Sequence, residues 1–553
     1  MPANCNRPQS GMNKNRVTKV SQRLSFTCLP CAKSKVVELR VLQKMREQLL
    51  EVATPEAILP VLEKRISEIE KGNKGTLAKN DDVAERTTSD SSTIEVSPVP
   101  EDKSPVPETA AEYLAWGRNY RQHNSGGSTR GQTPTTSSSP IHSDDVGTHV
   151  ELPPFWLAKR LVSFHIKYLC WHHNAIHSPT FLEQCELFWE TGTMVDPSWA
   201  SLYLSVLSTA AWCYPHNGEM LLEDHPKCMA RRWYDAMLAA LSQSNFMSRH
   251  SIFSVQAIAI STLIAHPLGS SNSHYILLGS AIRIAQCLGL DKLKEKPPAL
   301  TQASHDAWKS AITLHVGRRV WWQLIIQDYF AVPFSDTYTI NPDHFTTVMP
   351  SNCDDHDLEE VHSSQPTVSS YCIVLAKMAC LMPQLVDGAH RLSCLAPEKH
   401  YQHVLEIDLK LRDLASQMPS FLLRQTAEDP RWPSWVSWAR KTLTISAADK
   451  VIMIHRAFLL RSFRSPMYAY TRTTCLSASL TILREYERIG SSAVADIWVV
   501  PAFTISAAII VALDLLYRAE ATAESRRNRE LVQAARKRNK NGVTWAMMPD
   551  MKG

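Results

Sequence analysis

The chain has 553 residues, a length at which a single hydrophobic core stops growing, so we expect two or three structural units with a sizeable core in at least one. With 44% hydrophobic and 20% charged residues, the composition is ordinary for a soluble globular protein. The 32 Pro against 18 Gly favour helices with proline-punctuated connections and argue against a glycine-rich barrel, while a net charge of +5 identifies no partner by itself.

Cysteine use and hydropathy both indicate a protein of a reducing, aqueous compartment. The 13 Cys show no regular spacing and no N-terminal apolar stretch follows the basic residues, which favours cytosol or nucleus over secretion. The most apolar window, residues 497–516, is interrupted by Pro501 and Asp514. It therefore predicts a buried core helix and no membrane span.

Residues 1–37 form a basic N-terminus with seven Lys or Arg and no Asp or Glu. Such a segment either attracts a polyanion or is a solvated tail. It contains Cys28 and Cys31 in a Cys-x2-Cys spacing that lets two thiolates bind one zinc ion, followed by Lys33 and Lys35. Because zinc takes four ligands, the pair alone would bind it weakly or form a redox pair, and a lone Cys-x2-Cys spacing is more often incidental.

The next two segments differ sharply in character. Residues 38–71 carry apolar residues at helical spacing and predict either a short, broken coiled coil or a pair of amphipathic helices that packs on its own chain. Residues 72–150 are rich in Ser, Thr, Pro and Asp and predict a disordered linker. The rise in apolar density at Leu152 predicts a main domain over residues 151–524, followed by a basic tail, residues 525–553.

Two helices of the main domain are clearly patterned. In the first, one face is apolar and Gly289 stands where a C-terminal cap is needed; the face consists of Leu278, Ala281, Ile282, Ala285 and Leu288. In the second, an apolar stripe carries Asp328, and it consists of Val316, Val320, Trp321, Leu324 and Ile325. A carboxylate on an apolar face needs a partner, and we expect Arg318, Arg319 or a neighbouring helix to supply it.

The segment RLSFTCLPCAKSKV resembles the opening of the fungal binuclear zinc cluster, in which six cysteines share two zinc ions and basic residues contact DNA. The resemblance implies Cys28 and Cys31 as metal ligands and Arg23, Lys33 and Lys35 as DNA-binding residues. The match stops at position 38, where Glu38 stands in place of the third cysteine. Residues 38–52 then resemble the coiled coil that follows the sixth cysteine, as after a mis-spliced gene model or a true deletion.

The main domain resembles the middle regulatory region of the same family through five pieces in order. They are IHSPTF at 176–181, Trp189, GSAIRIAQCLGLDK at 279–292, RRVWW at 318–322 with Asp328, and MPSNCDD at 349–355. Most residues in these pieces have a core-packing explanation. Trp321 and Trp322 in particular are predicted as packing anchors.

An enzymatic interpretation finds little support. His173 and His177 are four residues apart and could offer two imidazoles to zinc, with His172 beside them, but no Glu lies between them as in a metalloprotease helix. The resemblance assigns His177 a structural role. The sequence also lacks a nucleophile elbow, a phosphate loop and a dinucleotide fingerprint, so we expect no enzyme.

The sequence thus predicts an all-α protein with a large multi-helical regulatory domain, preceded by a partial zinc-cluster head, a short coiled-coil helix and a disordered linker. We interpret it as a nuclear, sequence-specific DNA-binding transcription factor that regulates RNA polymerase II transcription of a biosynthetic or nutrient-use gene cluster. Expected partners are double-stranded DNA, a second copy of the chain, and a small-molecule effector or co-regulator. Zinc is expected only with a complete cluster. The alternative is a headless co-regulator that acts through protein partners without binding DNA.

Overall fold

The computed structural model describes residues 152–194, 196–214, 226–293, 305–335, 337–392, 397–489, 497–518 and 522–543, all of which lie within one compact unit, Leu49–Gly553. The first helices are α5 (Phe155–Tyr168), α6 (Cys170–His173), α7 (Ser178–Thr191), α8 (Trp199–Cys213), α9 (Pro226–Gln243), α10 (Ile252–Ala265), α11 (Ser271–Cys287) and α12 (His305–Ser335). The others are α13 (Ser370–Ala379), α14 (Leu381–Leu392), α15 (Pro397–Ser416), α16 (Val436–Ser462), α17 (Ala469–Ile489), α18 (Val499–Tyr517) and α19 (Ala523–Val543).

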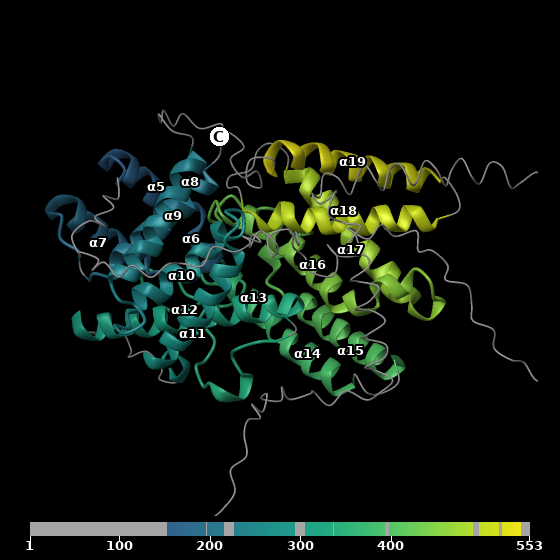
Figure 1. Cartoon of the computed structure of the whole chain (residues 1–553), viewed down its shortest axis with the longest axis horizontal. Coiled ribbons are helices and arrows are strands. Elements are labelled where there is room, and N and C mark those ends of the chain that lie inside the picture. Colours follow the sequence, from purple (N-terminus) through teal and green to yellow (C-terminus); the bar gives the residue numbers. More distant parts are fainter. Residues whose placement is uncertain are drawn as a thin grey trace, which may run out of the picture. The chain divides into compact units, whose positions relative to one another are not determined.

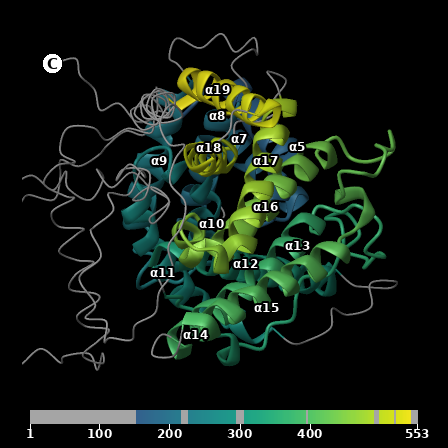
Figure 2. The same ribbon diagram turned by 90° about the vertical axis from the view of Figure 1, so that its right-hand side faces the viewer.

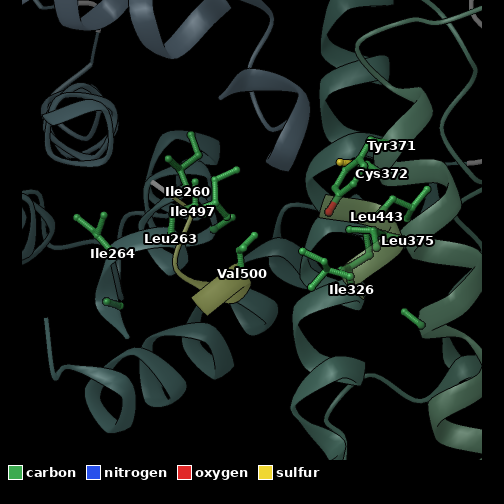
Figure 3. Close-up of a cluster of buried hydrophobic side chains, with 14 of the residues drawn as sticks. Ile260, Leu263, Ile264, Ile326, Tyr371, Cys372, Leu375, Leu443, Ile497 and Val500 are labelled. Atoms are coloured by element: carbon green, nitrogen blue, oxygen red, sulfur yellow. The ribbon is translucent and has the colours of Figure 1, made fainter. Parts of the chain in front are cut away.

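The all-α prediction is confirmed, since the described residues contain helices and loops but no strand. Helix α8 packs against α5, α9 and α10, and α17 packs against α16, α18 and α19 (Figure 1). One hydrophobic cluster runs through both groups of helices. Within it, Figure 3 shows Ile260 and Leu263 of α10 together with Ile497, which lies just before α18, and Val500 in its first turn. The described helices therefore share a main core.

Helix α11 has the apolar face and the C-terminal glycine that its pattern predicts. Leu278, Ala281, Ile282 and Ala285 are buried, and Gly289 adopts the left-handed conformation, with φ of 74°, that ends the helix. Leu288 was predicted on the buried face but is 37% exposed. It is the C-cap residue, still helical in its backbone, and it lies at the end of the helix where the chain turns away at Gly289.

Helix α12 is more central than its single predicted stripe indicates. It contacts α10, α11, α13 and α14, and every residue from 315 to 326 is buried. Trp321 and Trp322 are buried against Phe345, and the indole of Trp322 donates to the carbonyl of Val348 at 2.9 Å. The tryptophans are therefore packing residues, as predicted.

The expected arginine partner for Asp328 is wrong. Its carboxylate accepts the backbone N–H of Thr339 at 2.8 Å and that of Ile340 at 2.8 Å, in the loop that follows α12. Burial raises the pKa of Asp328, although these backbone donors partly offset the rise. Two backbone donors thus satisfy this carboxylate, and Arg319 pairs with Asp355 instead.

Helix α18 is the buried helix predicted from the apolar window. Two stretches of the described residues, Val499–Tyr517 and Ser370–Leu392, are long and apolar enough to cross a membrane by length and composition alone. In both, most of the apolar window is buried inside the protein, 72% and 61% respectively. Burial of this kind is typical of core helices.

Helix α19 occupies much of the segment that the sequence sets apart as a basic tail. It begins at Ala523, so the predicted boundary at residue 525 falls within its first turn. Leu531, Val532 and Ala535 are buried where it packs along α17 and α18 (Figure 2). The basic residues thus belong to a helix of the folded unit.

Candidate functional site

The residues predicted from the zinc-cluster resemblance lie outside the described residues. They are Arg23, Cys28, Cys31, Lys33 and Lys35. The predicted coiled coil at 38–71 and the predicted linker at 72–150 lie outside them as well. The candidate site that the structure describes is a different one, inside the helical domain.

Three of the sequence motifs that are far apart in the chain meet at one buried carboxylate, Asp355. The guanidinium of Arg319 on α12 donates to Asp355 through Nη1, and the backbone N–H of Ser178, the first residue of α7, donates to Asp355 Oδ2 at 2.8 Å. The ring of His177 contacts the carbonyl oxygen of the same residue at 2.6 Å. We call this cluster, with Cys353, the junction.

The tautomer of His177 follows from its partners. A carbonyl oxygen can only accept, so Nε2 must carry the proton that it donates to Asp355. Nδ1 is then the acceptor, and it receives the backbone N–H of Thr180 at 3.3 Å and lies 2.8 Å from the Thr180 hydroxyl. His177 therefore caps the start of α7, where Pro179 occupies the first turn, and joins that helix end to the Asp355 segment.

The ion pair at the centre of the junction is buried, with Arg319 3% and Asp355 6% exposed. Burial alone would raise the pKa of Asp355, but Arg319, the Ser178 amide and His177 together hold it below its ordinary value. Burial likewise opposes the charge on Arg319, and Asp355 and Cys353 reverse that effect and raise its pKa. Both groups are therefore ionised, and each neutralises the charge of the other.

The sulfur side of the junction is uncharged. Arg319 Nη2 lies 3.7 Å from Cys353 Sγ, and that sulfur lies 3.5 Å from Nδ1 of His315. Burial raises the pKa of the Cys353 thiol, and burial with the charges of Arg319 and Arg318 lowers the pKa of His315 to about 4. A neutral thiol beside a neutral imidazole lacks the thiolate that a nucleophilic cysteine requires.

The junction continues into α6 and α13. Asn174 holds a left-handed conformation after α6 and donates through Nδ2 to Ser369 Oγ at 2.9 Å, which donates to the Cys353 carbonyl at 3.2 Å. On the other side, Gln323 of α12 lies 2.8 Å from Nδ1 of His173. Hydrogen bonds thus connect α6, α7, α12, α13 and the segment that contains Asp355.

The histidines weighed as metal ligands are structural. His173 ends α6 and His177 precedes α7, with a left-handed residue between them, so they share no helical face. Burial first, and then His172, His165 and His274, lower the pKa of His173. Among the described residues, no group of three or more His, Cys, Asp or Glu side chains could hold a metal ion.

A second buried polar cluster joins α15, α16 and α17. Asp408 Oδ2 accepts from Arg412 Nε at 2.7 Å and from the Tyr470 hydroxyl at 2.9 Å, and Asp408 Oδ1 lies 3.6 Å from Nε2 of His455. Nδ1 of His455 lies 2.9 Å from the Thr471 hydroxyl. Burial opposes ionisation of Asp408, yet its partners hold its pKa at about 2, so the carboxylate is charged.

Sequence reasoning found the motifs of the junction but not the way they join. It treated 176–181, 318–322 and 349–355 as separate core pieces, and their order in the chain gives no sign that Asp355 pairs with Arg319. Nothing in the sequence singles out Asp408 or His455, since neither lies in a motif. Their only signal is that a charged or polar residue sits within a helix of apolar periodicity.

Residues 161–393 match the family model of the fungal specific transcription factor domain. This range contains all of the junction, from His177 to Asp355, and it ends directly after α14.

Curated relatives are transcription factors from fungi. The chain is 25% identical over 352 residues to the agnestins biosynthesis cluster transcription factor AgnL11 of Paecilomyces divaricatus, which covers 60% of this chain and 50% of that protein. It is 24% identical over 437 residues to the probable transcription factor lepB of Aspergillus flavus, which covers 72% and 76%. It is 23% identical over 321 residues to the Zn(2)-C6 fungal-type transcription factor pigI of Monascus ruber, which covers 56% and 37%. The chain thus spans half the length of the first of these relatives and just over a third of the third.

Proposed function

We propose that the chain is one of the fungal transcription factors that carry the fungal specific transcription factor domain, and that it is a sequence-specific, DNA-binding regulator of RNA polymerase II transcription that acts in the nucleus. The observation that carries this proposal is the agreement between the domain match at 161–393 and the basic Cys-x2-Cys segment that precedes it. The domain is not an enzyme, in keeping with a family of transcription factors.

The proposed DNA-binding head uses Cys28 and Cys31 as zinc ligands and Lys33 and Lys35 as contacts to bases and phosphates, with Arg23 beside them. Two relatives are named Zn(2)-C6 factors, which supports zinc as the cofactor. Two thiolates cannot complete a tetrahedral zinc site, so zinc binding requires further cysteines. The sequence has Glu38 at the position where the third of them is expected.

The helical domain is proposed to govern the activity of that head. The junction supports this role because it ties five parts of the domain to one buried ion pair, so a change in one part alters the packing of the others. A small effector or a co-regulator that binds the domain, and a second copy that pairs through residues 38–71, are the proposed partners. A ligand that binds only the folded domain raises its melting temperature, which a thermal-shift screen measures.

Two of the relatives are named as transcription factors of a cluster, the agnestins biosynthesis cluster and the pyrrolocin cluster, which supports control of a biosynthetic gene cluster here. Deletion of the gene should lower or raise the transcripts of neighbouring biosynthetic genes together, measured by RNA sequencing. If the transcripts of neighbouring biosynthetic genes stay unchanged while those of nutrient-use genes change, the chain regulates nutrient use, the other class of target predicted from the sequence.

The first test is to sequence the transcript across the codons for Lys35 to Leu39. An insertion that restores four cysteines makes the chain a zinc-cluster regulator. An uninterrupted transcript favours the second candidate function, a co-regulator that acts through partners without binding DNA, and the observation behind it is Glu38 at the position of the third cysteine.

The second test measures DNA binding by the full chain made from the verified transcript. Selection from random duplexes should enrich one short sequence, and Cys28→Ser should abolish both the enrichment and the bound zinc. Cys287→Ser, which changes an exposed cysteine on α11, is the matched control and should change neither. If the two variants show the same enrichment and the same bound zinc, Cys28 is not a zinc ligand.

A further inference from the structure

Helix α19 carries a net positive charge on a surface that the folded core leaves open. Between residues 523 and 538, six Lys or Arg stand against two Glu, a net of +4 in a chain whose total is +5. Its apolar side already packs against the protein, since Leu531 and Val532 are buried against α17 and α18. The helix therefore presents its charge on a fixed support.

Not every cation of α19 is available. Arg538 donates to the carbonyl of Tyr486 at 2.6 Å and stacks on its ring, with 4.3 Å to the ring centroid, so this residue anchors α19 to α17. Arg526, Arg527 and Lys537 differ from it. All three are exposed, and none forms an ion pair within the part of the chain that the structure describes.

These three cations lie along one side of the helix. Arg526 and Lys537 are separated by three helical turns, which places them on nearly the same face about 17 Å apart along the axis. Double-stranded DNA carries about one negative charge per 1.7 Å of its axis, so a row of this length faces many phosphates. Glu530 lies between them, and the other exposed carboxylate of the helix, Glu524, precedes the row and lies 3.4 Å from Arg518 Nη1.

The chemistry of the exposed face favours a phosphate backbone over other acidic partners. The exposed side chains between the cations are Glu530, Gln533 and Ala534, and the exposed large hydrophobic residues of the described chain all lie on other elements. Protein interfaces use aromatic and apolar anchors that this face lacks. Insertion into a membrane surface needs the apolar face, which already packs against α17 and α18.

We propose that the exposed basic face of α19, formed by Arg526, Arg527 and Lys537, binds the phosphate backbone of double-stranded DNA without reading its sequence. This contact is separate from the zinc-cluster head and rests on the proposed function only in that DNA is the polyanion a transcription regulator meets. It holds the helical domain close to DNA and adds affinity that depends on salt.

The test uses the full chain and a duplex of arbitrary sequence, with the dissociation constant measured by fluorescence anisotropy at several KCl concentrations. The variant is R526E/R527E/K537E. The matched control is R283E/K309E/K377E, which reverses three exposed cations on α11, α12 and α13 and changes the net charge equally. Circular dichroism and the melting temperature confirm that each variant is folded, and R526Q/R527Q/K537Q repeats the test without new negative charge.

The α19 variants should lose at least tenfold in affinity at low salt, and the slope of log affinity against log salt should fall by about 2.7, since each phosphate contact contributes about 0.9. The control should retain most of the slope. Equal slopes and affinities for the α19 variant and the control would overturn the proposal.

A third variant, K33E/K35E, separates this inference from the proposed function. If it abolishes selection of a specific sequence while the α19 variant binds arbitrary DNA normally, the zinc-cluster head stands and the α19 contact is rejected. If the α19 variant alone loses binding, the α19 contact stands and the head is rejected as the source of affinity.

Discussion

Two arginine pairs that look alike in the sequence, Arg318-Arg319 on α12 and Arg526-Arg527 on α19, have opposite environments. Both arginines of α12 are 3% exposed, and Arg319 is neutralised by Asp355. Both arginines of α19 are exposed and form no ion pair with the described residues. The same dipeptide is therefore a structural element in a helix packed on all sides and a surface charge in a helix packed on one side.

The difference shows that the contribution of a charged side chain to folding stability depends on whether it is buried or exposed. A buried charge is costly without its partner, because water cannot replace that partner. An exposed charge is solvated whether or not it is paired, and it contributes little to stability. The α12 pair should therefore control folding, and the α19 pair should control association with other charged molecules.

The largest effect is expected from removal of the junction carboxylate. Asp355→Ala leaves Arg319 buried without its counter-ion and should lower the free energy of unfolding by about 3–5 kcal/mol, measured by urea denaturation. Glu359→Ala removes an exposed carboxylate from the same segment and should be nearly neutral. A comparable loss in both variants would mean that the ion pair carries no special weight.

A smaller loss is expected from Arg319→Lys. Lysine keeps the charge but lacks the fork that reaches both Asp355 and Cys353, so about 1–3 kcal/mol of stability should be lost. Arg526→Lys, made in the exposed pair, should leave the unfolding midpoint unchanged. A tolerated lysine at 319 would show that the buried site requires charge alone.

Acid should weaken the buried region through its histidines. Burial lowers the pKa of His165, His172, His274 and His315 to about 4, against about 6.5 in the unfolded chain, so the folded state excludes their protons. Their contribution is complete above pH 6.5 and is lost as the pH falls from 6.5 towards 4.

Each of these buried histidines should lower the free energy of unfolding by on the order of 1 kcal/mol per pH unit in that window, measured by urea denaturation between pH 7.5 and 5. His274→Gln, which keeps a hydrogen-bonding group near Thr262, should reduce the slope. His356→Gln, at an exposed position, is the control. A flat stability profile across the window would contradict the burial of neutral imidazoles.

The smallest effect on stability is expected at the surface. R526A/R527A should change the free energy of unfolding by less than about 0.5 kcal/mol, because both side chains are exposed and alanine favours the helix. The same variant should lower the salt slope of DNA binding by about 1.8. A large loss of stability would show that these two arginines stabilise the fold, as the buried arginines of α12 do.

Helical periodicity predicted much of the fold and little of the site. The apolar face of α11 and its cap at Gly289 were readable because both depend on neighbours within one or two turns. The partner of Asp328 was wrong because its donors, Thr339 and Ile340, lie in a loop whose path no periodicity describes. A pattern gives the side of a helix that is buried, not the group that it meets.

By itself, the sequence determined the helical class, the buried helix at 497–516 and the order of motifs that resembles the family's regulatory region, since each depends on residues close together in the chain. Only the tertiary structure decided that Arg319 pairs with Asp355, 36 residues away in the chain. It also brought the His177 ring to the carbonyl oxygen of Asp355, 178 residues away. It also decided which arginine pair is open to solvent. Partners at such separations depend on how the helices pack against one another, and packing is a property of all the surfaces that must be buried together.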